Sequence, residues 1–443
     1  MDQKSFVSIA SNYFKRFPYL ELPFDYLPHP DLALVIVIPV FDEKDVLPTL
    51  RSLFQEQDSV FFHVEIIAVV NNAHNSSIDI KEQNMETHGS LKEFALNHNN
   101  EKIKLISFLV DDLSPKHAGV GWARKIGMDF ALKRFQHIEK NGVIIGLDAD
   151  TVVERNYLNS IYSHFKSHDN TAVSIHFEHP IDDDRYSSFH QQSIICYELH
   201  LRYYKNALQY VGFPFAFHTI GSAFALLASA YARQGGMNRR KAGEDFYFIN
   251  KLIKGENFGE ISSTKVMPSP RLSNRVPFGT GRAILEAHEK KKDLSLTYSF
   301  DCFKDLKAWL SSVKSGEVTF INFPLSIQQF LGESNWKKSI EELNRHTNNH
   351  TSFMKRFYAL FDAFWVLKFV HFYRDNIMPI SNLKDNVNSL LLESNKAILN
   401  RARSAYIFQI MGQKKGSKRT PLNNNYFFTI YLSESTTALN ASG

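Results

Sequence analysis

The chain has 443 residues, of which 44% are hydrophobic, so it is long enough to bury a large core and to form two or three domains. Its 51 lysines and arginines against 46 aspartates and glutamates give a net charge of +5, too small an excess for a dedicated nucleic-acid-binding protein. The two cysteines, Cys196 and Cys302, are too few for a zinc cluster or a disulfide framework, and they favour a reducing, cytoplasmic location.

Residues 1–17 carry charged and polar side chains where a secretory signal would need an apolar run. Their apolar residues instead recur at helical spacing, at Phe6, Ile9, Ala10, Tyr13, Phe14 and Phe17. We expect a helix docked on its own domain, with an amphipathic helix on a membrane surface or a partner as the alternative. The longest apolar stretch, residues 211–231, contains glycine, proline and polar residues, so we do not expect it to cross a bilayer.

Between residue 32 and about residue 266, apolar strand patterns alternate with helical patterns. Strands are expected at residues 34–38, 64–70, 103–108, 143–147 and 171–177. Helices are expected at residues 45–57, 76–100, 121–140 and 187–210. This alternation predicts an α/β domain with a mostly parallel sheet flanked by helices.

The character of the chain changes after about residue 286, where the pattern becomes one of helices separated by polar turns, among them residues 336–345 and 352–372. We place a boundary near residue 295. The expected regions are an N-terminal helical lead (1–30), the α/β domain (31–295) and a mainly helical C-terminal region (296–443). Residues 412–419 are basic and are expected to lie on the surface.

The apolar run at residues 142–147 ends in two carboxylates one residue apart, Asp148 and Asp150. Open α/β sheets place their ligands at the carboxyl ends of strands. In extended chain, residues i and i+2 point to the same side, so the two carboxylates can share one divalent cation, and that cation can hold a diphosphate.

The first predicted strand ends in Pro39, Phe41 and Glu43, and the second ends in Asn71-Asn72. An aromatic wall at Phe41, with acceptors at Glu43 and Asn72, suits the base and ribose of a nucleotide. The alternative is that Glu43 is simply an acidic residue at a helix start, where the helix dipole favours it.

Residues 119–127 open a helix with glycines and with the basic pair Arg124 and Lys125. This combination suits an anionic ligand near a helix N-terminus, and the alternative is an ordinary glycine-rich turn. It is not a dinucleotide-binding fingerprint, which needs glycine where Arg124 stands and should follow the first strand.

Gly243 is followed by two adjacent carboxylates, Glu244 and Asp245, at the start of another helix. One carboxylate is a candidate general base on an acceptor hydroxyl, with the other orienting it. The alternative is a helix N-terminus with favourable acids.

Residues 268–281 have no regular period and contain Arg271 and Arg275 among hydroxyls and glycines, which is the composition of an anion-binding loop. His288 follows and is a candidate metal ligand, although a single histidine is more often structural. The acidic residues 182–184 are expected to form a solvated loop, with metal binding as the alternative.

Taken in order over residues 32–285, these motifs resemble those of family 2 glycosyltransferases of the GT-A fold. The matching positions are Pro39, Phe41 and Glu43; Gly121, Ala123 and Arg124; Asp148 and Asp150; and Glu244 and Asp245. Residues 221–237 are similar to the family's acceptor-side segment. Where the family usually has acids at the end of the second strand, this chain has Asn71-Asn72, which leaves the base preference open.

The resemblance implies a GT-A nucleotide-diphospho-sugar transferase that moves one sugar, with inversion, to a hydroxyl of a sugar, lipid-linked or small-molecule acceptor. It implies a divalent metal, Mn²⁺ or Mg²⁺. The implied roles are nucleotide-sugar contacts at Pro39, Phe41, Glu43, Asn72, Gly121, Arg124 and Asp148; metal binding at Asp150, Asp148 and His288; a diphosphate and acceptor loop with Gly221, Arg271 and Arg275; and catalysis by Asp245 with Glu244. The Gln-x-x-Arg-Trp signature of processive members is absent, which favours a single addition. A cytoplasmic enzyme is expected, with contact to the inner face of a membrane as an open alternative.

Two other functions fit parts of the sequence. Asp148 and Asp150 also match the nucleophile strand of haloacid-dehalogenase-like phosphatases, but those enzymes open their core with this strand, and here three strands are predicted before it. A non-catalytic nucleotide-sugar-binding protein is the second alternative, motivated by Asn71-Asn72.

Overall fold

The protein is described here by a computed structural model, which covers residues 3–23, 26–115, 118–181, 183–238, 243–275 and 279–394. Its centre is an eight-stranded sheet in the order β3-β2-β1-β4-β7-β6-β8-β5. The strands are β1 (Leu32–Val40), β2 (His63–Ala73), β3 (Ile103–Leu113), β4 (Val143–Gly146), β5 (Thr151–Val153), β6 (Ala172–Phe177), β7 (Phe224–Leu227) and β8 (Phe258–Pro268). The predicted basic segment at 412–419 and the first of the acidic residues at 182–184 lie outside the described residues.

The first half of the sheet, β3-β2-β1-β4, is parallel throughout, and β6 and β8 are also parallel to each other. β7 runs antiparallel to both of its neighbours, and β5 is antiparallel to β8. β1, β2 and β4 are almost wholly buried, which is why they appear in the sequence as largely apolar runs. The prediction of a mostly parallel α/β sheet is therefore confirmed.

Helices cover both faces of the sheet, and successive residues of each strand point to opposite faces. In β1, for example, Leu34 and Ile36 belong to the core under α2 (Leu47–Phe54), α3 (Ile78–His98) and α5 (Tyr157–Ser167). Val35 and Val37 belong to the core under α1 (Gln3–Arg16), α4 (Val120–His137), α7 (Ala228–Arg233) and α8 (Glu244–Gly255). Both cores depend on burial of branched apolar side chains, each worth about 1.5–3 kcal/mol.

The N-terminal helix α1 is docked on its own chain, as expected from its apolar spacing. Its Phe6, Ala10 and Tyr13 side chains are buried in the core shared with α4 and α7. The Tyr13 hydroxyl also donates a hydrogen bond of 2.6 Å to Asp129 in α4. Among the described residues, no helix is long and apolar enough to cross a membrane.

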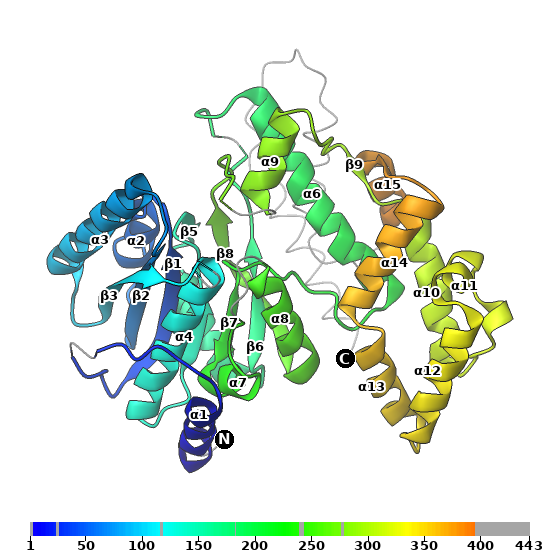
Figure 1. The fold of residues 1–443 in the computed structure, drawn as a ribbon, viewed down its shortest axis with the longest axis horizontal. Helices are drawn as coiled ribbons and strands as arrows, with labels where there is room; N and C mark the ends of the chain where they lie inside the picture. The colour runs from blue at the N-terminus through cyan, green and yellow to red at the C-terminus, as the bar shows by residue number, and fades with distance from the viewer. Residues whose placement is uncertain are drawn as a thin grey trace, which may run out of the picture.

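A long helix, α6 (Ser188–Val211), connects the sheet to the C-terminal helices (Figure 1). Its buried side shares a third core with those helices, in which Trp309 is fully buried. The elements beyond α9 (Thr280–His288) are β9 (Leu296–Thr297), α10 (Phe300–Lys314), a short 3₁₀ helix (Phe320–Asn322), α11 (Leu325–Leu331), α12 (Glu333–Arg345), α13 (His350–Leu360), α14 (Ala363–Asn376), β10 (Ser381–Asn382) and α15 (Leu383–Glu393). A mainly helical C-terminal region is thus present; its status as a separate domain stays a prediction.

The single helix predicted over residues 352–372 is wrong, because the structure has two helices there. α13 ends at Leu360 and α14 begins at Ala363. Asp362 caps the start of the second helix, with its side chain accepting from the backbone N–H groups of Phe364 and Trp365. Three strands of the eight-stranded sheet were also not predicted: β5 and β7 have only 3 and 4 residues, and β8 is interrupted by polar residues.

Candidate active site

A cavity of about 1150 Å³ opens at the carboxyl ends of β1 and β4. Eleven of the residues singled out in the sequence line it: Pro39, Phe41, Glu43, Arg124, Asp148, Asp150, Gly221, Glu244, Asp245, Arg271 and Arg275. They come from six separate stretches of chain, and several of them meet because β1 and β4 are parallel neighbours whose carboxyl ends lie at the same edge of the sheet.

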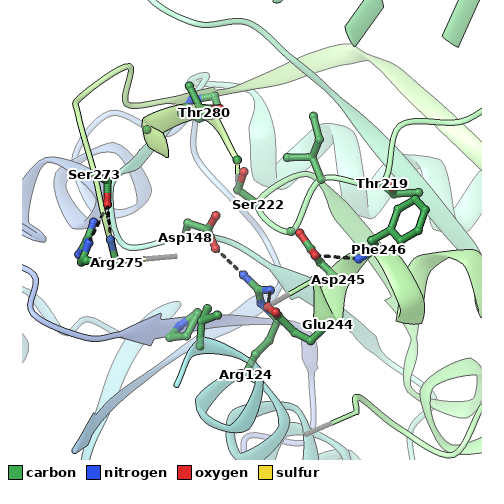
Figure 2. A pocket seen from close by; sticks show the side chains of 18 of the residues that line it. Arg124, Asp148, Thr219, Ser222, Glu244, Asp245, Phe246, Ser273, Arg275 and Thr280 are labelled. Atoms are coloured by element: carbon green, nitrogen blue, oxygen red, sulfur yellow. Dashed lines mark hydrogen bonds and ion pairs between the residues drawn. The ribbon is translucent and has the colours of Figure 1, made fainter. Parts of the chain in front are cut away.

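Arg124 is a buried cation of this site, with only 2% of its side chain exposed. From α4 it donates one hydrogen bond to Asp148, after β4, and another to Glu244, at the start of α8 (Figure 2). Burial raises the pKa of Glu244 to about 7, although the charge of Arg124 opposes this shift. Arg124 therefore connects the acidic strand end to the acidic helix start across the floor of the cavity.

Asp245 lies beside Gly221, and the absence of a side chain at Gly221 makes the close approach possible. A Cβ atom at position 221 would lie 2.8 Å from Asp245 Oδ2 and 2.9 Å from a terminal nitrogen of Arg124. The other oxygen, Asp245 Oδ1, accepts a 2.7 Å hydrogen bond from the backbone N–H of Phe246. Burial raises the pKa of Asp245 above its usual range.

We expect Gly221→Ala to remove most activity, because its methyl group would displace the carboxylate of Asp245 or the guanidinium of Arg124 from its position in the site. Real Cβ atoms are essentially never found within 3.0 Å of such neighbours. The matched control is Gly89→Ala in α3, where an added Cβ meets nothing within 4 Å and helix propensity favours alanine by about 1 kcal/mol. Turnover and thermal midpoint of both variants check the prediction; a fully active Gly221→Ala enzyme would contradict it.

Arg271 and Arg275 extend from the loop after β8 to the end of β1. Arg271 binds Glu43 through both of its terminal nitrogens, one at 2.7 Å, and lies 2.9 Å from Asp150. Arg275 donates to the carbonyl oxygens of Phe41 and Asp42 at 3.0 and 3.2 Å. The two arginines thus hold the loop against the strand end, and Arg275 lies on the side of the cavity away from Asp245 (Figure 2).

The two carboxylates near these arginines differ in their pKa. Burial favours the neutral form of Glu43, but the hydrogen bonds and charge of Arg271, with Arg275, outweigh it and lower the pKa of Glu43. Burial raises the pKa of Asp150 to about 6, with Asp148 and Glu43 adding to the shift and Arg271 opposing it. Asp150 is therefore the more easily protonated carboxylate of the two.

Three of the predicted site residues do not line the cavity. Asn72 accepts a 2.6 Å hydrogen bond from Asn84, which itself accepts one of 2.8 Å from the backbone of Asp42. Through Asn84, Asn72 thus stabilises the loop after β1 without lining the cavity. Gly121 lies one residue beyond the lining residue Val120 in α4. His288, at the end of α9, packs its ring against Phe189 and His190, with centroids 5.0 and 5.4 Å apart.

The structure adds a histidine that the sequence did not indicate. His179 follows β6, lines the cavity and is held by the fully buried Glu198, which accepts from its backbone N–H at 2.7 Å and lies 3.0 Å from its Nδ1. Its Nε2 lies 3.2 Å from the Thr280 hydroxyl at the start of α9. The contact joins residues 101 positions apart, so no local pattern could have revealed it.

The side chains of this site can hold a divalent ion only together with oxygen atoms of a bound diphosphate or water. Among the described residues, no group of three or more acidic, histidine or cysteine side chains surrounds a common point. Asp148 and Asp150 do provide two carboxylates at one strand end, and Mg²⁺-like ions are typically held by one or two carboxylates together with water and substrate phosphates. The pair fits an ion that a diphosphate helps to bind.

Comparison with known families identifies the class of protein that carries this site. Residues 35–233 match the family described as glycosyl transferase family 2, which confirms the resemblance found in the sequence. The matched segment includes most of β1, the acidic pair after β4 and Gly221. This part of the chain is a glycosyltransferase domain. No curated protein matches the sequence.

Solved structures with a similar fold are distant. S. aureus TarS in complex with UDP-GlcNAc is 13% identical with a TM-score of 0.36, over 67% of this chain and 77% of that one. The mannosyltransferase PcManGT from Pyrobaculum calidifontis, with GDP-Man and Mn²⁺, is 13% identical with a TM-score of 0.32, over 85% and 94%. Glucosyl-3-phosphoglycerate synthase from Mycobacterium tuberculosis, with Mn²⁺, UDP-Glc and phosphoglyceric acid, is 11% identical with a TM-score of 0.33, over 60% and 82%.

Proposed function

We propose that the protein transfers a single sugar, with inversion, from a nucleotide-diphosphate sugar to a hydroxyl acceptor. The observation that carries this proposal is the position of Arg124, which joins Asp148 on the donor side of the cavity to Glu244, next to Asp245. One buried cation thus fixes the acidic strand end and the candidate base in one arrangement. Such preorganisation is what a displacement reaction between two bound substrates requires.

The donor is proposed to lie between the ends of β1 and β4. Phe41 and Glu43 line the cavity where the nucleoside would sit, and Asn75 and Ser76 line it from the end of β2. Arg271 and Arg275 bring positive charge to the diphosphate. Asn72 acts on this pocket only indirectly, through its hydrogen bond to Asn84.

Asp148 and Asp150 are the residues that would hold a divalent metal ion. When bound, such an ion supplies neutralisation of the charge that develops on the departing nucleoside diphosphate. Asp150 is already bound to Arg271 at 2.9 Å, so the arginine and the diphosphate would occupy neighbouring positions around the same carboxylate. His288 stays a predicted ligand, although its ring is packed against Phe189 and His190.

Asp245 is proposed to accept the proton of the acceptor hydroxyl. The acceptor oxygen forms its bond to the anomeric carbon while the bond from that carbon to the diphosphate oxygen breaks on the opposite face. Glu244 orients the site through Arg124 and does not need to take a proton itself. A phosphatase gains no support, because Asp148, its required nucleophile, is held by the buried Arg124 and three parallel strands precede it.

We expect Asp150→Ala to weaken binding of the donor with its metal ion by at least about tenfold. The wild-type chain should show a thermal shift with one class of UDP-, GDP- or dTDP-sugar in the presence of Mn²⁺, because a ligand that binds only the folded state stabilises it by about 2.7 kcal/mol at 100 times its Kd. The shift should be lost in Asp150→Ala and retained in Asp301→Ala, a half-exposed aspartate of α10. An unchanged shift in Asp150→Ala would remove this residue from the proposed donor site.

A further inference from the structure

The cavity continues past Asp245 into a second compartment that the donor does not need. Six uncharged residues define this aromatic compartment: Leu201, Tyr204, Leu208, Phe215, Tyr298 and Leu367. Phe246 and Thr219 also line the cavity and lie on the side of Asp245 away from Arg275 (Figure 2). The compartment therefore begins where an acceptor must approach the candidate base.

The volume of the cavity lies above the usual range for a single small molecule. Pockets for one small molecule usually measure about 300–1000 Å³, and this continuous cavity measures about 1150 Å³. A nucleotide sugar placed along β1 and β4 leaves the part between α6 and α14 for a second molecule.

The C-terminal helices build one wall of the aromatic compartment. Leu367 belongs to α14, and Phe364 of the same helix packs on Phe246 and Tyr247, the two residues after Asp245, with ring centroids 4.9 and 4.7 Å apart. The start of α14 is also tied to α8 by an ion pair of 2.8 Å between Asp362 and Lys254. The wall is thus fixed to the helix that carries the candidate base.

The charges on the described residues of the compartment give no support to an anionic occupant. Of the described residues that line the cavity between α6 and α14, Lys205 is the one with a positive charge, and its ammonium group is buried and bound to Glu260 at 2.5 Å. A phosphate or carboxylate on the acceptor would find no available cation among them. Aromatic and leucine side chains instead favour an apolar surface, which they shield from water.

We propose that this compartment binds the uncharged apolar body, alkyl or aromatic, of an acceptor whose hydroxyl group is presented to Asp245. The proposal rests on the glycosyl transfer proposed above and names the acceptor class for it. It also gives the C-terminal helices a role, because without α14 the compartment would have no wall opposite α6.

The test uses N-phenyl-1-naphthylamine, an uncharged aromatic probe whose fluorescence rises on binding to apolar sites. We expect about one probe to bind per full-length chain. Leu367→Gln should weaken binding about tenfold or more, because a buried polar amide replaces apolar contact. The matched control is Lys368→Gln, the exposed neighbour on α14, which should bind the probe as the wild-type chain does. Octyl β-glucoside below its micelle concentration should displace the probe, and glucose should not.

Each outcome decides the proposal. Absence of probe binding, equal binding by the Leu367→Gln variant and the wild-type chain, or displacement by glucose as effective as by octyl glucoside would overturn it. The nucleotide-sugar thermal shift, measured on the same proteins, separates the two proposals. If the nucleotide-sugar thermal shift is normal but probe binding does not depend on Leu367, the proposed acceptor class alone is overturned. If no nucleotide sugar gives a thermal shift, the proposed glycosyl transfer, on which the acceptor class rests, is overturned.

Discussion

Asp245→Asn is expected to abolish sugar transfer while the nucleotide sugar still binds. Asparagine has nearly the same shape, and its side-chain oxygen can still accept the hydrogen bond from the Phe246 backbone N–H. Its amide cannot take up the proton of the acceptor, and general-base assistance typically contributes about 10²–10⁴ in rate. Turnover should therefore fall at least about 100-fold, with an unchanged nucleotide-dependent thermal shift.

The control for this substitution is Asp301→Asn, which changes a half-exposed aspartate of α10 that lines no part of the cavity. It should leave turnover and nucleotide binding unchanged. An Asp245→Asn enzyme with full turnover would show that the base is another group. Loss of nucleotide binding together with turnover would indicate that Asp245 holds the site in shape rather than accepting the proton.

The pH dependence of turnover provides a second check on Asp245. Burial raises the pKa of this carboxyl above the value of about 3.9 that an exposed aspartate has. The base is active only when ionised, so kcat/KM should be lost as the pH falls through this raised pKa. Because Glu244 is its direct neighbour, the apparent pKa of this loss in kcat/KM belongs to the pair of carboxyls and not to Asp245 alone. In Asp245→Asn the remaining rate should no longer show this decrease at low pH.

The location of the site could be predicted from the sequence because its key residues follow buried strands. Asp148 and Asp150 come directly after the apolar run of β4, and Glu43 follows that of β1. Parallel strands bring their carboxyl ends to one edge, so these residues meet without any knowledge of side-chain packing. Their presence in one cavity is observed, whereas their roles stay predictions.

Contacts between distant elements could not be predicted. Asn72 looked like a nucleotide ligand because it ends a strand, yet its partner is Asn84 in the helix that follows. The packing of Phe364 on Phe246 joins α14 to α8 across 118 positions, and nothing in either local pattern indicates it. Sequence patterns show which side chains belong to a strand end, but they do not show which distant helix closes the site.

Arg124→Met is expected to lower the free energy of unfolding by about 3–5 kcal/mol and to remove transfer activity. Methionine keeps the apolar stem but leaves Asp148, Glu244 and Asp245 without the buried cation that two of them bind directly. Breaking a buried ion pair from one side typically costs this much, because the remaining charges stay desolvated. Denaturant unfolding measures the loss, and Arg124→Lys should recover only part of it, since one ammonium group cannot bridge both carboxylates with the geometry of a guanidinium.

The pH dependence of this loss distinguishes an uncompensated charge from a packing defect. The pKa of Glu244 is already raised to about 7 by burial, and without Arg124 it should rise further. At any pH between the pKa of this carboxyl in the unfolded chain and its raised pKa in the folded variant, the folded variant binds a proton that the unfolded chain does not. Its stability deficit relative to the wild-type chain should therefore be largest above pH 7 and should shrink as the pH falls toward 5. A packing defect would give a deficit that does not change with pH. The matched control is Arg185→Met, in which an arginine with 81% of its side chain exposed is removed; its unfolding free energy should stay within about 0.5 kcal/mol of the wild-type value.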